Sequence, residues 1–114
     1  VRLCTQPVAV LTDWNCASAG DDFAVFAKGA PNVTLIGTNT AGGTGQLLLK
    51  ELPGGFRFAV STYNCVMEDG TPVCNNGVQP DIWCEQTVSD ALAGQDTVLL
   101  KAIEHFEEKA VERE

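Results

Sequence analysis

Residues 7–21 read PVAVLTDWNCASAGD, and this stretch decides the fold. Its first six residues form an apolar run of strand length, which is typical of a strand buried on both faces of a parallel sheet. Ser18 and Asp21 then stand three residues apart, like the hydroxyl and the carboxylate of a capping box at a helix N-terminus. The stretch predicts a buried strand that runs into a helix at Ser18.

The next residues complete a strand–helix–strand unit. Pro31-Asn32 ends the predicted helix, and the apolar run at residues 33–36 predicts a second short strand. This order indicates a parallel crossover and the α/β class. The predicted helix carries one apolar face, made of Phe23, Phe26, Ala27 and Ala30.

The rest of the chain predicts a hairpin, a short strand and a closing helix, all within a single domain over residues 1–114. The hairpin strands lie at 47–52 and 56–62, the short strand at 82–84, a polar linker at 86–95, and the terminal helix at about 96–111 after the cap Asp96. The apolar stripe of the terminal helix comprises Leu99, Ala102, Ile103, Phe106 and Ala110.

The predicted sheet begins almost at the first residue of the chain. A parallel sheet must be covered on both faces, which needs more elements than these residues supply. We therefore expect a fold truncated on its N-terminal side. An upstream segment of the same protein, or a partner chain, would complete it.

The composition restricts the classes of partner. The chain has 15 acidic and 7 basic residues and a formal net charge of -8, without a basic stripe that could neutralise phosphates. No apolar run approaches the roughly 20 residues that span a bilayer. We expect no nucleic-acid partner and no transmembrane segment.

Five cysteines are many for 114 residues, but none of them forms a CxxC pair. A zinc site is therefore not expected, and neither is any other metal or cofactor. The thiols are either small buried groups of a reduced protein or partial disulfides of an exported one. We favour an exported protein, periplasmic or at the surface of a bacterial cell, with Cys65–Cys74 as the bridge.

Ser18 is the candidate for chemistry. A hydroxyl at the junction of a buried strand and a helix lies beside free N–H groups of the helix N-terminus, which can stabilise an oxyanion. The alternative is a simple capping serine, and the local pattern alone favours that alternative. Cys16 precedes the helix by two residues, so a packing role is favoured for its thiol.

A serine nucleophile needs a base, and the sequence offers no convincing one. His105, the one histidine, is interpreted as a surface or helix-end residue, and neither Lys28 nor Lys50 has a setting that would lower the pKa of its amine. The glycine-rich residues 37–45 lack the lysine of a phosphate-binding loop and precede a strand. Their glycines instead allow the backbone to approach a peptide or an active site.

Five segments in this order resemble the catalytic core of the C-terminal processing (tail-specific) serine peptidases. They are the nucleophile segment at 7–21, the strand and Gly-x-x-Thr-x-Gly loop at 31–43, the Leu-Pro-x-Gly hairpin at 51–55, the Gly-Val-x-Pro-Asp signature at 77–82 and the closing helix from 94 to 103. The resemblance covers nearly the whole chain. It implies a fold related to the crotonase and Clp-protease β-β-α core.

The resemblance also implies an activity and a set of site residues. Ser18 matches the nucleophile that attacks peptide bonds near protein C-termini through an acyl-enzyme, and the backbone N–H of Ala19 matches one oxyanion donor. Asp21 matches the acidic residue three places after the serine. Thr40 and Gly42 belong to the loop near the site. The implied partner is a protein or peptide substrate, and the oligomeric state stays open.

Departures from the family pattern affect whether this chain can catalyse peptide hydrolysis. Gly43 stands where the Ser-Lys branch has its lysine, Gln46 lies near the glutamine that would orient it, and Asn75 stands near the expected glutamate. The glycine-rich loop is similar to the tricorn-type branch, whose histidine comes from an upstream segment. We expect a fragment that is inactive alone, or alternatively a non-catalytic module of the same fold that binds a peptide or an apolar ligand.

Overall fold

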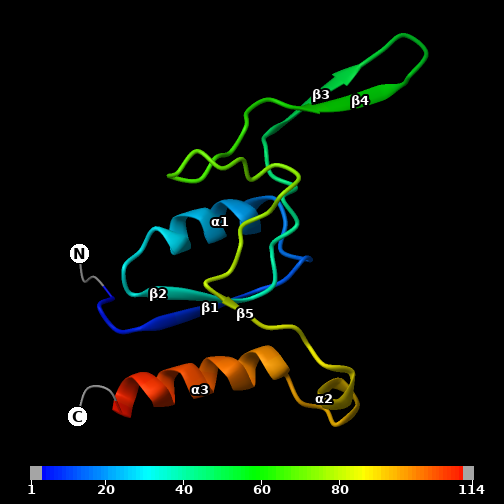
Figure 1. Cartoon of the computed structure of the whole chain (residues 1–114). Coiled ribbons are helices and arrows are strands. Elements are labelled where there is room, and N and C mark those ends of the chain that lie inside the picture. Colours follow the sequence, from blue (N-terminus) through cyan, green and yellow to red (C-terminus); the bar gives the residue numbers. More distant parts are fainter. Residues whose placement is uncertain (1–3, 112–114) are drawn as a thin grey trace.

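The computed structural model describes residues 4–111 and shows a three-stranded parallel sheet between two helices (Figure 1). The helix α1 lies on one face of the sheet and α3 on the other, as expected for an α/β layer structure. The elements in chain order are β1 (Val8–Thr12), α1 (Ala19–Lys28), β2 (Val33–Gly37), β3 (Leu47–Glu51), β4 (Arg57–Ser61), β5 (Ile82–Trp83), α2 (Val88–Leu92) and α3 (Thr97–Val111).

The parallel sheet has the strand order β1-β2-β5. Val8 pairs with Val33 and Thr12 with Gly37, so the predicted parallel unit is confirmed. The expectation that β1 is buried on both faces is wrong for the described residues. Val8 to Val10 are only half-buried and Leu11 is exposed, because β1 forms the open edge of the sheet.

The core is small and lies between α1, β2 and the segment 73–78. Its buried apolar members, which pack against one another, are Ala24, Ala27, Leu35, Val73 and Val78. The alanines allow α1 to approach the sheet closely. Phe23 and Phe26, predicted for the core face of this helix, are 59% and 79% exposed, so that part of the prediction is wrong.

In the helix α3, as in α1, a small residue is buried while larger apolar residues stay exposed. Asp96 caps it as predicted, since its Oδ1 accepts the N–H of Leu99 at 2.9 Å. Ala102 is buried, whereas Leu99 and Ile103 of the predicted stripe are each 47% exposed. The predicted linker at 86–95 is also wrong in part. It contains the short helix α2, whose cap Thr87 accepts the N–H of Asp90 at 3.1 Å.

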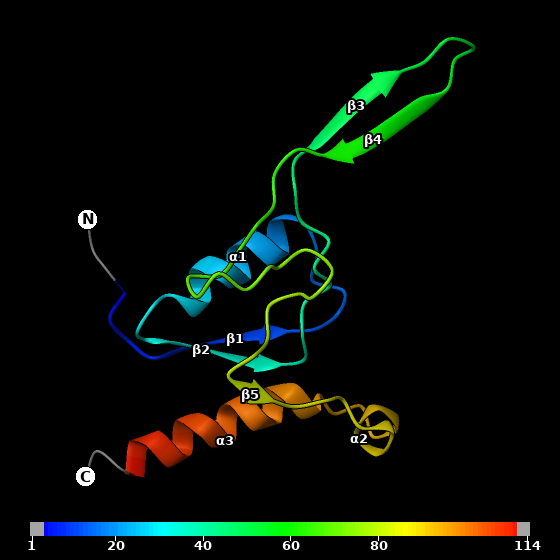
Figure 2. The same cartoon turned by 45° about the horizontal axis from the view of Figure 1, so that its top comes forward.

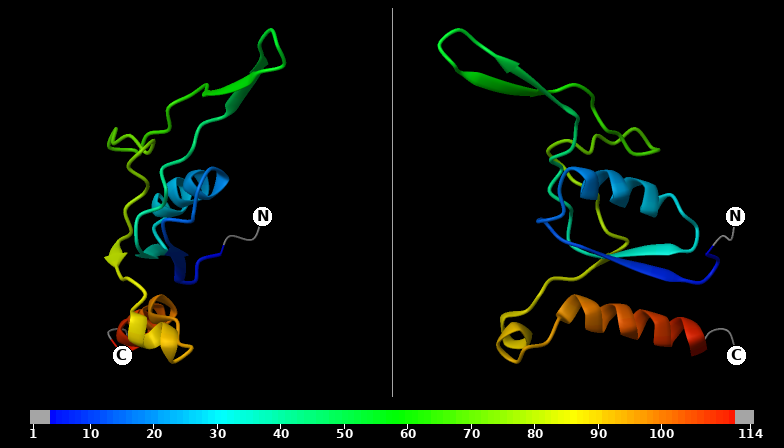
Figure 3. Two further views of the ribbon diagram at one scale, coloured as in Figure 1. Left: turned by 90° about the vertical axis from the view of Figure 1, so that its right-hand side faces the viewer. Right: turned by 180° about the vertical axis from the view of Figure 1, so that it is seen from behind.

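The β3–β4 hairpin has the predicted antiparallel pairing and projects away from the sheet (Figures 2 and 3). Every residue of both strands is exposed. The radius of gyration is 17.8 Å, compared with about 13 Å for a compact domain of this length. The projecting hairpin contributes to the longest dimension of 67 Å.

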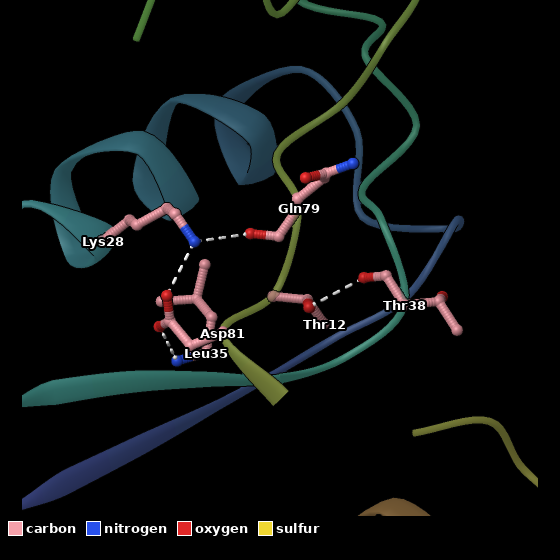
Figure 4. Close-up of polar contacts among 6 residues, drawn as sticks. All are labelled: Thr12, Lys28, Leu35, Thr38, Gln79 and Asp81. Carbon is pink, nitrogen blue, oxygen red and sulfur yellow. Dashed lines mark hydrogen bonds and ion pairs between the residues drawn. The ribbon is translucent and has the colours of Figure 1, made fainter. Parts of the chain in front are cut away.

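The Gly-Val-x-Pro-Asp signature ties α1 to β2 (Figure 4). Asp81 accepts a hydrogen bond from Lys28 Nζ at 2.7 Å and another from the Leu35 N–H at 2.8 Å, and Lys28 also donates to the carbonyl of Gln79 at 2.9 Å. Burial raises the pKa of the Asp81 carboxyl. The hydrogen bonds from Lys28 and Leu35 and the Lys28 charge outweigh burial, so the net pKa is lowered.

All five cysteines lie in the described part of the chain and are unpaired, so the predicted Cys65–Cys74 bridge is wrong. The two residues do lie on facing segments, since Cys65 accepts the N–H of Val73 at 2.9 Å. The Cys74 thiol instead donates to the carbonyl of Thr44 at 3.5 Å. The thiols of this region therefore pack as small side chains.

Candidate active site

The backbone of Ser18 is strained. Its φ is 57° and its ψ is -117°, and Asn75 is the one other non-glycine residue of the described chain with a positive φ. A capping residue normally has β-region angles, so Ser18 is not an ordinary cap. Its side chain lies near the Asp21 N–H as in a capping box, but makes no cap hydrogen bond of normal geometry. Such strain costs about 1–3 kcal/mol and persists where the surroundings enforce it.

Asp21 is the residue that enforces this conformation. Its side chain is fully buried, Oδ2 accepts the Ser18 N–H at 2.9 Å, and Oδ1 accepts the Gly42 N–H at 2.9 Å. One carboxylate therefore links the strained turn to the glycine-rich loop. Because both partners are backbone groups, the link sets main-chain geometry.

Hydrogen bonds to neighbouring segments also hold the glycine-rich loop in place. Thr40 Oγ1 accepts the Val78 N–H at 2.8 Å, and the Ala41 N–H donates to Cys16 at 2.8 Å. The N–H of Asn75 donates to the Gly42 carbonyl at 2.9 Å. Thr40 and Gly42 thus support the site from the core side.

A hollow of about 470 Å³ opens at Ser18. It is lined by Ser18, Ala19, Asp22, Thr44, Gly45, Gln46, Leu47 and Tyr63. The Ala19 N–H has no acceptor in the described chain, so it is free to bind an oxyanion. Gln46 lies in the hollow as the resemblance implied. Gly43 lies next to the residue before Ser18, because a Cβ added at Gly43 would be 3.9 Å from the Cβ of Ala17.

Asn75 does not line this hollow. Its side chain is exposed, and its left-handed backbone serves to direct the N–H at Gly42. Of the supporting residues expected from the sequence, Asp21 and Gln46 lie at Ser18, and Asn75 lies one loop away.

Sequence reasoning missed a hydrogen-bonded group next to Ser18. The Asp22 carboxylate accepts Thr44 Oγ1 at 2.5 Å and Tyr63 Oη at 3.1 and 3.2 Å. Asp22 belongs to the first turn of α1, where acidic residues are favoured, and this was a signal in the sequence. Thr44 and Tyr63 join it only through tertiary structure.

None of the described residues that line the Ser18 hollow is a histidine or a lysine, and its one carboxylate, Asp22, already accepts hydrogen bonds from Thr44 and Tyr63. Lys28 is paired with Asp81, and Lys50 lies on the projecting hairpin. His105 lies on α3, across the sheet from α1; it is half-buried, and its Nε2 has no hydrogen-bond partner in the described chain. Within residues 4–111 the serine stands without a base.

A larger hollow of about 950 Å³ lies at the carboxyl ends of the parallel strands and includes Cys16 but not Ser18. Burial, followed by the charges of Asp21 and Asp13, raises the pKa of the Cys16 thiol. A raised pKa disfavours the thiolate and hence nucleophilic chemistry at Cys16. The smaller hollow is therefore the better candidate site.

The described residues offer neither a metal site nor a membrane-spanning helix. No group of three or more His, Cys, Asp or Glu side chains within residues 4–111 is arranged to hold a metal ion. Nor does this part of the chain contain a helix long and apolar enough to cross a bilayer.

The fold is similar to those of several solved peptidases. A putative peptidase from Parabacteroides merdae matches with a TM-score of 0.82 and 32% identity over 89% of this chain. The tricorn protease matches with a TM-score of 0.78 and 30% identity over 90%. The photosystem II D1 C-terminal processing protease matches with a TM-score of 0.60 and 25% identity over 71%.

The chain spans only part of each of these proteins: 32% of the Parabacteroides chain, 10% of the tricorn chain and 21% of the D1 processing protease. No curated protein sequence matches it significantly. The model of peptidase family S41 matches residues 2–84, which is most of the chain. The order of segments, the α/β architecture and this match agree, and the chain therefore belongs to peptidase family S41.

Proposed function

We propose that the full-length protein is a serine endopeptidase that uses Ser18 as its nucleophile. Its substrates would be proteins or peptides cleaved near their C-termini. The observation that carries the proposal is the strained backbone of Ser18 at the N-terminus of α1, in the connection from the parallel strand β1. A capping serine has no need of such strain, whereas a nucleophile gains an exposed hydroxyl from a sharp strand-to-helix turn.

The mechanism follows from the groups around the hydroxyl. Ser18 Oγ attacks the peptide carbonyl while its proton passes to a base, and the C–N bond then breaks to leave an acyl-enzyme that water hydrolyses. The free N–H of Ala19 stabilises the oxyanion. Asp21 holds the turn in its reactive conformation through the two backbone bonds described above.

Two parts of this machinery would come from outside the described residues. They are the base and a second oxyanion donor, supplied by an upstream segment or by a partner chain. The isolated chain should then be inactive, because losing the base alone removes several orders of magnitude in rate.

Covalent labelling tests the proposal. We expect a fluorophosphonate to label the full-length protein at Ser18, and Ser18→Ala to abolish both labelling and cleavage of an unfolded substrate. Ser89→Ala on α2 is the control and should leave both unchanged. An unlabelled protein, or a fully active Ser18→Ala variant, would contradict the proposal.

A second candidate is a binding module of the same fold. The observation that favours it is the hollow at Ser18, which no described histidine, lysine or arginine lines. This candidate predicts saturable binding of a peptide or an apolar ligand that Ser18→Ala does not change, together with no labelling of the full-length protein.

Export to the periplasm or the bacterial cell surface also stays a proposal. Because all five cysteines are unpaired, disulfides do not support it; what supports it is the similarity to the photosystem II D1 C-terminal processing protease. Fractionation of cells that produce the full-length protein would test it, and recovery only in the cytoplasm would contradict it.

A further inference from the structure

Among residues 4–111, Asp22 is the one charged residue that lines the hollow at Ser18. It lies in the first turn of α1, four residues after Ser18, and lines the same hollow. The residue is half-buried, and the hollow therefore excludes part of the water that would otherwise screen its charge.

The charge of Asp22 has no cationic partner in the described chain. Its hydrogen-bond donors are the neutral hydroxyls of Thr44 and Tyr63. The ion pairs found within residues 4–111 are Lys28–Asp81 and Lys101–Glu104, and both lie elsewhere. The neighbouring Asp21 is also bound only by backbone N–H groups, so it adds to the negative potential at the turn.

The two hydroxyls also hold the Asp22 carboxylate in place. Thr44 is buried and Tyr63 reaches across from the segment after β4, so the carboxylate is bound from two separate parts of the chain. A positioned charge loses less entropy on binding than a mobile surface charge does. This arrangement suits recognition of a charged group.

We infer that Asp22 selects a cationic side chain, that of lysine or arginine, next to the substrate bond that Ser18 attacks. The inference rests on the proposed function and adds a substrate class to it. A substrate carboxylate at the same position would be repelled by Asp22 and Asp21. A neutral side chain of the same length should bind with intermediate strength.

Binding measurements in the full-length Ser18→Ala variant test the inference without depending on catalysis. Two peptides are compared that differ in one residue beside the intended scissile bond, lysine in one and norleucine in the other. We expect the lysine peptide to bind roughly tenfold more tightly, with a preference that shrinks as salt is added.

In the Ser18→Ala variant, adding Asp22→Asn should make the lysine and norleucine peptides bind about equally. Adding Tyr63→Phe instead should reduce the preference for the lysine peptide only in part. The matched control is Glu107→Gln, which removes the same charge from the exposed surface of α3 and should keep the preference. An equal affinity for both peptides, or a preference that survives Asp22→Asn, would overturn the inference.

Equal weakening of both peptides by Asp22→Asn would also overturn it, because the cation opposite Asp22 would then belong to the protein. The proposed function is judged separately by labelling of Ser18 in the protein that retains the serine. A failure of either idea can thus be recognised on its own.

Discussion

The loop region around Ser18 and the β3–β4 hairpin both contain glycines with a positive φ, yet the two regions are held in different ways. At Gly77, behind the Ser18 loop, an added Cβ would lie 1.9 Å from the Thr40 carbonyl oxygen. At Gly55, in the hairpin turn, no atom would lie within 4 Å of such a Cβ. The first region is closely packed, and the second touches little beyond itself.

The Ser18 turn is held by contacts within this chain, whereas the hairpin is not. Buried hydrogen bonds fix the Ser18 turn, whereas the hairpin exposes leucine and phenylalanine side chains along both strands. A two-stranded hairpin alone is marginally stable in water. The geometry of the Ser18 turn is therefore a property of this segment, and the hairpin depends on what surrounds it.

The largest effect should come from the crowded glycine. Gly77→Ala combines an unfavourable φ with a backbone clash and should lower the free energy of unfolding by about 4 kcal/mol. Gly55→Ala has a similar φ without the clash and should cost about 1 kcal/mol. Urea denaturation measures both. Equal losses would mean that the two regions are packed alike.

Removing the carboxylate of Asp21 should have the next largest effect. Asp21→Ala leaves the N–H groups of Ser18 and Gly42 without a partner, at a cost of about 3 kcal/mol together. It should also slow fluorophosphonate labelling of Ser18 in the full-length protein. Asp69→Ala is the control, because that exposed carboxylate accepts a single backbone bond from Thr71. Unchanged stability and labelling would show that the turn is held by other contacts.

The Asp81–Lys28 pair should make stability depend on pH. The pKa of Asp81 is lower in the folded than in the unfolded chain, so its stabilisation is complete above the unfolded value of about 3.9. It is lost as the pH falls through the folded value. Because the pair is partly exposed, we expect about 1 kcal/mol.

Urea denaturation at several pH values tests this prediction with Asp81→Asn. The free energies of unfolding of wild type and variant should differ at pH 6 and converge at the acid end. A difference that persists in acid would show that the charge of Asp81 is not responsible.

The smallest effect should come from the hairpin surface. Leu49 is 65% exposed, so Leu49→Ser should change the unfolding free energy of the 114-residue chain by less than about 0.5 kcal/mol. Leu35→Ala in the core should cost about 2–5 kcal/mol. A large loss for Leu49→Ser would mean that the hairpin folds back onto the body of the chain.

The order of elements was predictable from the sequence because it depends on local signals. Apolar runs of strand length identified β1 and β2, and Pro53 with two glycines identified the hairpin turn. Helix faces were predicted less well. Spacing shows which residues share a face, but not whether small or large side chains meet the sheet.

The candidate site was predictable in part. Ser18, Asp21 and Gln46 were expected there from local position and family resemblance, and they meet as expected. Thr44 and Tyr63 were not expected, because they reach Asp22 from positions 22 and 41 residues further along the chain. No local pattern encodes such a contact.

By itself, the sequence determined the α/β class, the strand-to-helix turn at Ser18 and the shortage of a base. These features depend on residue types and short-range spacing. The tertiary structure decided that the capping serine has a strained backbone, and that a buried carboxylate holds it against a loop 24 residues away. Backbone strain persists only where distant contacts outweigh its cost, and those contacts exist only in the folded chain.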